Sequence, residues 1–151
     1  VVTHTYAVAN PRPDGRVRLG AAGIDKGDDR YNTTAVGQTV RGVAAPGRTV
    51  TYVVTVQNDA TFGDVLGLRG PGSTDRFRVT YTAGGTDVTA QVTAGTYVTP
   101  ELAPGAVHVI EVVVKVRRGA PPGSSLAGAM TARSLSDATR RDRVGFTTRR
   151  A

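Results

Sequence analysis

Apolar and polar residues alternate over four long stretches of the chain, which is the pattern of a β-strand with one buried face. In residues 49–57, valine and tyrosine take the even positions, and threonine and glutamine take most of the odd ones. The same alternation runs through residues 76–82, 86–93 and 107–118. These stretches therefore predict strands that turn every second side chain into a core.

Shorter runs rich in valine and threonine predict further strands, and turn residues separate them. The additional strands are expected near residues 16–19, 38–43, 64–69, 96–99, 126–134 and 142–148. The turns are marked by Pro46-Gly47, Gly70–Gly72, Gly84-Gly85, Pro104-Gly105 and Pro121–Gly123. No apolar period of 3.6 residues persists long enough to predict a helix. The pattern predicts an all-β, two-sheet immunoglobulin-like sandwich of about seven to nine strands.

The first residues are expected to stand apart from this sandwich. Val1–Val8 has strand character, but the proline-rich stretch Asn10–Asp14 separates it from the rest and predicts a stiff, extended spacer. We therefore divide the chain into an N-terminal extension strand with its linker, residues 1–15, and the sandwich, residues 16–151. We expect residues 1–8 either to add to an open sheet edge of a neighbouring copy or to fold back as a first strand of their own sandwich.

Composition adds limits to this picture. A chain of 151 residues can bury one core without disulfides, and it contains no cysteine. No apolar run approaches the ~20 residues of a membrane helix, so no membrane insertion is expected, and no signal-peptide pattern is present. The net charge is +7, and all but two of the 19 basic residues, Lys26 and Lys115, are arginine. Such a charge is compatible with an anionic partner.

The middle of the chain resembles a known family. The stretch Pro46–Asp59 is similar to the "PG-x-x-V-x-Y-x-V-x-V-x-N" strand of bacterial Ig-like surface repeats, of the conserved-repeat or cell-adhesion-related type. Leu102–Gly105, with the strand after it, resembles their "L-x-PG" turn and strand. The resemblance covers roughly residues 38–135 and implies an extracellular or surface spacer, stalk or adhesive unit. The segment Gly20–Gly37 has no counterpart in this pattern.

That segment carries the candidate metal ligands. Asp25, Asp28, Asp29 and Asn32 could offer hard oxygen ligands to Ca²⁺, although their spacing is not that of an EF-hand. Asp and Asn also stabilise turns by bonding their own backbone, and a long loop needs such residues. We therefore assign no metal site and no cofactor, and we expect the fold to be stable without metal.

The sequence shows no catalytic constellation, so we expect no enzyme activity. His4 and His108 fall in separate strands, and a structural role at the sandwich rim is expected for His108. Lys115 with Asn58 raises the question of the lysine–asparagine isopeptide bond found in some surface Ig-like domains. Because Lys115 lies on the polar face of its strand, we expect no such bond.

Basic residues offer a second functional hypothesis. Arg76 and Arg78 lie on the exposed face of one expected strand, and Lys115 and Arg117 on that of another. Further arginines crowd the C-terminus, at positions 140, 141, 143, 149 and 150. We expect a structural or assembly module of a bacterial surface protein or filament, with self-association or tandem neighbours as partners. The alternative is a binding module that recognises an anionic polymer or glycan through a basic sheet face.

Overall fold

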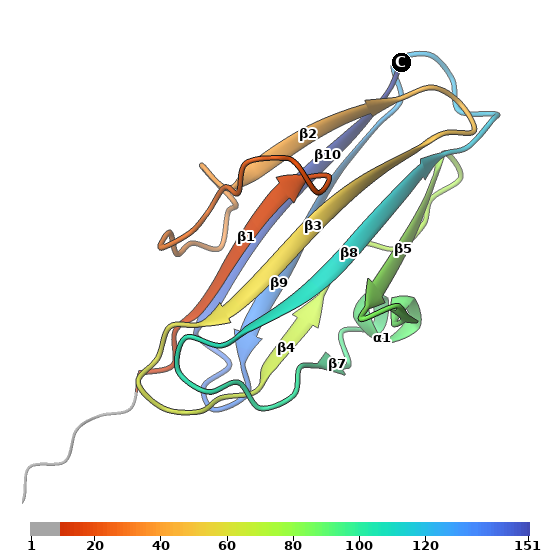
Figure 1. Ribbon diagram of the computed structural model, residues 1–151. Helices are drawn as coiled ribbons and strands as arrows, with labels where there is room; N and C mark the ends of the chain where they lie inside the picture. The colour runs from red at the N-terminus through yellow and green to blue at the C-terminus, as the bar shows by residue number, and fades with distance from the viewer. Residues whose placement is uncertain (1–9) are drawn as a thin grey trace, which may run out of the picture.

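The computed structural model describes residues 10–151, which form two β-sheets packed face to face (Figure 1). In spatial order, the first sheet holds β1 (Pro13–Leu19), β3 (Thr49–Asn58), β8 (Val107–Val116), β5 (Phe77–Ala83) and β6 (Thr86–Asp87). The second holds β2 (Thr39–Ala44), β10 (Arg141–Arg150), β9 (Ser125–Ser134), β4 (Leu66–Arg69) and β7 (Tyr97–Val98). Neighbouring strands are antiparallel except β2 and β10, which are parallel. The chain is an all-β, immunoglobulin-like sandwich, as predicted.

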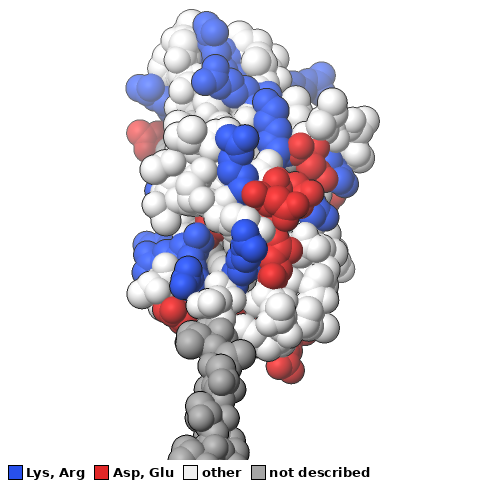
Figure 2. All heavy atoms as spheres, turned by 90° about the vertical axis from the view of Figure 1, so that its left-hand side faces the viewer, with Lys and Arg blue, Asp and Glu red and all other residues white. Residues whose placement is uncertain are grey.

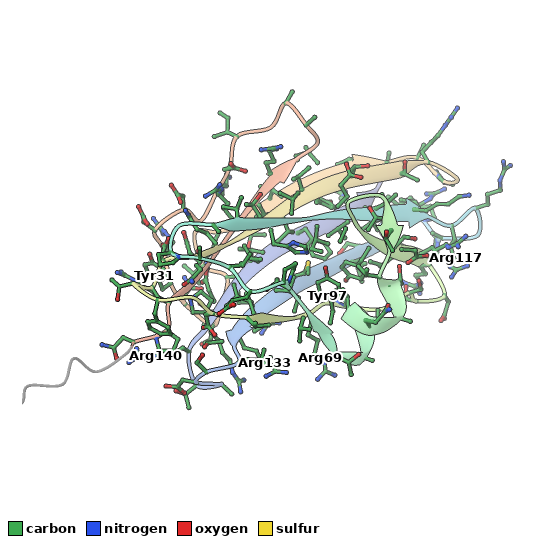
Figure 3. The ribbon with its side chains drawn as sticks, turned by 60° about the horizontal axis from the view of Figure 1, so that its bottom comes forward. Tyr31, Arg69, Tyr97, Arg117, Arg133 and Arg140 are labelled. Atoms are coloured by element: carbon green, nitrogen blue, oxygen red, sulfur yellow. The ribbon has the colours of Figure 1, made fainter. Side chains whose placement is uncertain are left out.

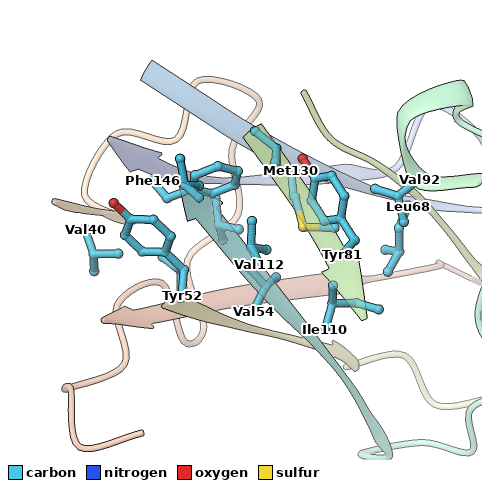
Figure 4. Close-up of a cluster of buried hydrophobic side chains, with 14 of the residues drawn as sticks. Val40, Tyr52, Val54, Leu68, Tyr81, Val92, Ile110, Val112, Met130 and Phe146 are labelled. Carbon is cyan, nitrogen blue, oxygen red and sulfur yellow. The ribbon is translucent and has the colours of Figure 1, made fainter. Parts of the chain in front are cut away.

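The core lies between the sheets and is built from the alternating positions of the long strands (Figure 4). On β3, Tyr52 and Val54 are fully buried, and Ile110 and Val112 on β8 are equally so. The second sheet contributes Phe146 and other apolar side chains to the core, among them Leu66, Leu68 and Met130. Each side chain that leaves water contributes about 25 cal/mol per Å² of apolar area, so these alternate rows hold the sheets together.

Three Pro-Gly turns have one geometry. Gly47, Gly105 and Gly123 have φ near +80°, and in each turn the residue after glycine donates its N–H to the carbonyl of the residue before proline. This is a type II turn, in which proline sets the first central residue and glycine adopts the second without strain. Gly84 and Gly85 also have positive φ and close the hairpin between β5 and β6.

One predicted strand was wrong. Residues 86–93 form only the two-residue β6 and then the helix α1 (Thr89–Ala94). Val88 and Val92 are buried, four residues apart on one helix face, whereas Ala90 is exposed. Alternation in a strand and four-residue spacing in a helix both place these two valines on one side. The sequence pattern therefore could not distinguish a strand from a helix here. Gly95, with φ +74°, ends the helix.

Two further predictions need correction. The sandwich has ten strands rather than about seven to nine, although each of the ten overlaps a stretch expected to be a strand; the two-residue β6 and β7 lie within the stretches 86–93 and 96–99. Its first strand begins at Pro13, so three residues of the expected linker 1–15 pair with β3. Proline is compatible with the first position of an edge strand. The predicted strand Val1–Val8 lies outside the described residues.

The described chain enters and leaves the sandwich at opposite ends. Gly15, near the start of β1, donates its N–H to the carboxylate of Asp142, near the start of β10. From there β10 runs the length of the second sheet, and its last residue, Arg150, pairs with Ala44 at the far end of β2. In Figure 1, β1 begins at the lower left and the C-terminus lies at the top.

Candidate functional site

The long segment 20–37 folds along the outer side of β1. Lys26 exchanges two backbone hydrogen bonds with Val17, at 2.9 and 2.8 Å, which fixes the segment to the edge of the first sheet. Asp25 and Asp28 pair with Arg16, at 3.5 and 3.3 Å. Asn32 serves a turn, since its side chain bonds to the backbone of Thr34 and Val36. The four candidate ligands named from the sequence therefore do not converge on one point.

Only Asp29 of that set joins a cluster of carboxylates. One oxygen each of Asp14, Asp29 and Asp59 lies within 4.8 Å of the other two. Asp14 comes from β1, and Asp59 follows the last residue of β3. The antiparallel register pairs Asp14 with Gln57, two residues before Asp59, and this brings the two aspartates together. Sequence reasoning missed both, because only strand pairing reveals their proximity.

Asp14 is the buried member of this acidic cluster, with 1% of its surface exposed. Its Oδ2 accepts the N–H of Asp29 at 3.0 Å, but its Oδ1 has no hydrogen-bond partner among residues 10–151. Burial raises the pKa of Asp14 to about 7, and the nearby charges of Asp59, Asp142 and Asp28 act in the same direction, against the hydrogen bond from Asp29. The site thus holds a carboxylate that lacks a compensating positive charge.

Tyr31 covers the solvent side of the acidic cluster. Its hydroxyl donates to Asp59 Oδ2 at 2.5 Å and lies 3.3 Å from Asp29 Oδ1, and the guanidinium of Arg12 sits 4.1 Å from the centre of its ring. Burial and the bond to Asp59 raise the pKa of Tyr31. An open cleft of about 510 Å³ adjoins the ring and is lined by residues 10–13 and 139–141. Tyr31 and Arg140 are labelled at this end of the sandwich in Figure 3.

Asp142 lies beside the cluster and has a different role. It accepts hydrogen bonds from the backbone of Gly15, Asn32 and Arg143 and from the side chain of Gln38, at 2.6 to 3.1 Å. Burial raises its pKa, and these four donors oppose that shift. Asp142 therefore joins β1, β10 and the end of the 20–37 segment, and its oxygens are already satisfied.

A second candidate surface is the outer face of the second sheet. Along β2, β4, β7, β9 and β10, the outward positions hold only small residues, valine and arginine. We call this the arginine face, after its six outward arginines. They are Arg41, Arg69, Arg133, Arg141, Arg143 and Arg149. Within residues 10–151 none of the six forms an ion pair, and no acidic strand residue shares the face.

Register explains how the arginine face is built. Thr131 on β9 lies between Arg69 and Arg143, and Arg133 lies between Gly67 and Arg141. Because glycine, alanine and threonine separate the guanidinium groups, the surface is hollowed into two shallow basins of about 340 and 400 Å³. Arg69 and Arg133 point outward from this sheet in Figure 3. Three of the six belong to the C-terminal arginines noted in the sequence.

The basic face predicted on the first sheet is more mixed. Arg78 and Lys115 are cross-strand partners and exposed, as expected. The same side of β8 carries exposed Glu111, paired with Thr82, and apolar Val109. Arg117 donates to the carbonyl of Thr74 rather than reaching freely into solvent. The larger field of unpaired positive charge therefore lies on the second sheet.

His108 has a structural setting, as predicted. Its Nε2 lies 2.7 Å from the hydroxyl of Tyr97, the two rings are stacked, and burial lowers its pKa. Lys115 and Asn58 lie at opposite ends of the paired strands β3 and β8, so their side chains cannot meet. Asn58 instead bonds the carbonyls of Phe62 and Leu102, both at 2.8 Å.

Comparisons with known proteins support the fold alone. No protein-family model matches the chain. No curated protein matches either. Among solved structures, a family 123 glycoside hydrolase from Clostridium perfringens superposes with a TM-score of 0.52 at 8% identity, over 75% of this chain and 23% of that one.

Two smaller solved domains also match, with lower scores. The ASH/PapD-like domain 7 of human CEP192 gives a TM-score of 0.46 at 12% identity, covering 100% of this chain and 96% of that domain. The N-terminal domain of PorA gives 0.41 at 12% identity, over 90% and 96% of the two chains. Within the described part of the chain, no helix is long and apolar enough to cross a membrane.

Proposed function

We propose that this chain is a non-catalytic structural module of a bacterial surface protein or extracellular filament, arranged end to end with its neighbours. The observation that carries the proposal is the placement of its two ends. The chain enters beside Asp142 and leaves beside Ala44, at opposite poles of the long axis of the sandwich. When the chain enters a domain at one pole and leaves at the other, successive domains can follow one another along a line, as in a stalk or linear array.

The open edge of β2 offers a way to join copies. Among the described residues β2 pairs only with β10, so its other side has no strand partner. The carbonyls of Gln38 and Ala44 accept from Gly145 and Ala151 of the β10 side, so odd-numbered residues of β2 turn their backbone groups to the open edge. We propose that residues 1–8 of a neighbouring copy add to this edge as an extra strand.

Assembly through this strand addition is tested by deleting the N-terminal segment or by blocking the open edge of β2. Deletion of residues 1–9 should abolish polymers seen by light scattering and electron microscopy, and leave the circular dichroism of the sandwich unchanged. Val43→Pro removes one outward N–H of β2 and should have the same effect, because proline at an edge position spares the inner ladder. If the truncated chain unfolds, residues 1–8 belong to their own sandwich and strand exchange is wrong.

The arginine face supports a second candidate function, the binding of an anionic polymer or glycan. Six outward guanidinium groups on one sheet face could contact successive phosphate, sulfate or carboxylate groups, and no outward strand residue of that sheet is aromatic. Binding through charge alone predicts a strong dependence on salt.

Two double variants with the same change in charge distinguish binding through the second sheet from binding through the first. Arg133→Glu with Arg143→Glu changes the arginine face, and Arg76→Glu with Arg78→Glu changes the first sheet by the same charge. On heparin–agarose the first double variant should elute at much lower salt than the second. Equal elution of the two would attribute retention to net charge and contradict a specific face.

A further inference from the structure

The acidic cluster of Asp14, Asp29 and Asp59 lies at the pole where the chain enters the sandwich. It differs from the other acidic side chains of the neighbouring loop. Asp25 and Asp28 each pair with Arg16, whereas Asp14, Asp29 and Asp59 have no ion pair within residues 10–151. Figure 2, which views the side of β1 and β2, shows acidic side chains gathered on this flank between basic ones.

Carboxylates repel one another when they share a small volume, and a buried one also loses its hydration. Three of them converge here within 4.8 Å, and the most buried, Asp14, leaves Oδ1 without any hydrogen-bond donor in the described chain. A buried polar atom without a partner costs about 1–3 kcal/mol in general, so a group that supplies a partner to Oδ1 is stabilising. A bound cation would satisfy Oδ1 and remove the repulsion together.

We propose that Asp14, Asp29 and Asp59 form a binding site for Ca²⁺. The ligand set is oxygen only, which selects a hard cation. Two oxygens on opposite sides of one Ca²⁺ stand about 4.6–5.2 Å apart, since each Ca–O bond is ~2.3–2.6 Å. Oxygens that lie within 4.8 Å of one another are therefore close enough for one ion to be shared between them with small side-chain movements. Mg²⁺ fits this ligand set less well, because it demands near-ideal octahedral geometry and is usually bound by only one or two carboxylates.

Water can supply the remaining ligands of the ion. Asp29 is exposed and Asp59 partly so, which leaves room for water to complete the roughly six to eight ligands that Ca²⁺ takes. The site ties β1, the end of β3 and the 20–37 segment together, so the ion should hold the segment against the sheet. With three carboxylates we expect a Kd on the order of 10⁻⁴–10⁻³ M, the range of extracellular modules.

Calorimetric titration of the whole chain with CaCl₂ tests the site. Wild type should bind one equivalent and, with Ca²⁺ tenfold above Kd, melt about 3–6 °C higher than in chelator. Asp14→Asn keeps an oxygen for the N–H of Asp29 but removes the charge, and should lose at least tenfold in affinity. Asp25→Asn, in the same loop but outside the cluster, is the matched control and should bind as wild type does.

Terbium gives an independent readout, because Tb³⁺ occupies calcium sites and emits when a neighbouring tyrosine is excited. The chain has no tryptophan, and the Tyr31 hydroxyl touches two of the proposed ligands. Tyr31→Phe should abolish most of this emission while Ca²⁺ still binds by calorimetry. Absence of calcium heat in wild type, unchanged affinity in both Asp14→Asn and Asp59→Asn, or undiminished emission from Tyr31→Phe would each overturn the proposal.

Discussion

Tyr52 links the two sheets through both halves of its side chain. The ring packs 5.2 Å from that of Phe146, and the hydroxyl meets the carbonyl of Thr147 at 2.9 Å and Thr148 Oγ1 at 2.8 Å. Gly42 opposite leaves the space that this hydroxyl needs, since a Cβ there would approach it to 2.8 Å. The sequence predicted the burial of Tyr52 from alternation, but the bond to β10 depends on how the sheets face each other.

Removing only the hydroxyl isolates the polar half of this contact. Tyr52→Phe keeps the ring but leaves buried Thr148 Oγ1 without its partner, so the free energy of unfolding should fall by about 1–2 kcal/mol. Urea denaturation with an unchanged m-value would measure it. Tyr52→Asp places a charge in the same apolar site and should prevent folding altogether. A Phe variant as stable as wild type would show that the hydroxyl adds nothing.

His108 makes stability depend on pH in one direction. Burial lowers its pKa, so in acid the unfolded chain takes up a proton that the folded chain resists. The contribution of neutral His108 is fully present above about pH 6.5, the unfolded value, and is lost as the pH falls toward the lower folded value. Denaturation at about pH 7.5 and about pH 5.5 should therefore show a larger loss in wild type than in His108→Gln. If wild type and His108→Gln lost the same free energy of unfolding between the two pH values, protonation of His108 would not be the cause.

At the scale of elements, turns were easier to predict than short strands. Pro46-Gly47 and Pro104-Gly105 are type II turns because proline and glycine each satisfy one backbone requirement locally. The helix α1 was missed and the two-residue strands β6 and β7 were expected to be longer, since their patterns span too few residues to distinguish periods. The acidic cluster was predicted only in part: Asp29 stood out in its loop, whereas Asp14 and Asp59 depend on the β1–β3 register.

The conformational demand of these turns is measurable at Gly47. Its φ is +80°, and a Cβ would have ordinary contacts, at 3.5 Å or more, so only the backbone opposes a side chain. Gly47→Ala should lower the free energy of unfolding by about 1 kcal/mol. Gly119→Ala is the control, because that glycine lacks positive φ and a Cβ there meets nothing within 4 Å. If both variants lost the same amount, the left-handed conformation would not be the cause.

At the scale of the whole molecule, charge is distributed unevenly. The arginine face covers the second sheet, while the carboxylates of the cluster gather at the pole where β1 begins. The net charge of +7 is thus a poor description of how the domain meets a partner. A copy that approaches with its acidic pole toward another copy's arginine face is favoured over one that approaches face to face.

The opposite placement of the two ends also decides how the domain bears a load. A pull on a chain of such domains acts on β1 toward one pole and on β10 toward the other, along the strand axes. Ladder hydrogen bonds lie across that direction, so the β1–β3 register of seven pairs and the β10–β9 register of nine pairs are strained together rather than opened one by one. Stretched within a tandem array by atomic force microscopy, the domain should yield at a higher force than one pulled from residue 13 and residue 58, which unzips a single hairpin-like pair.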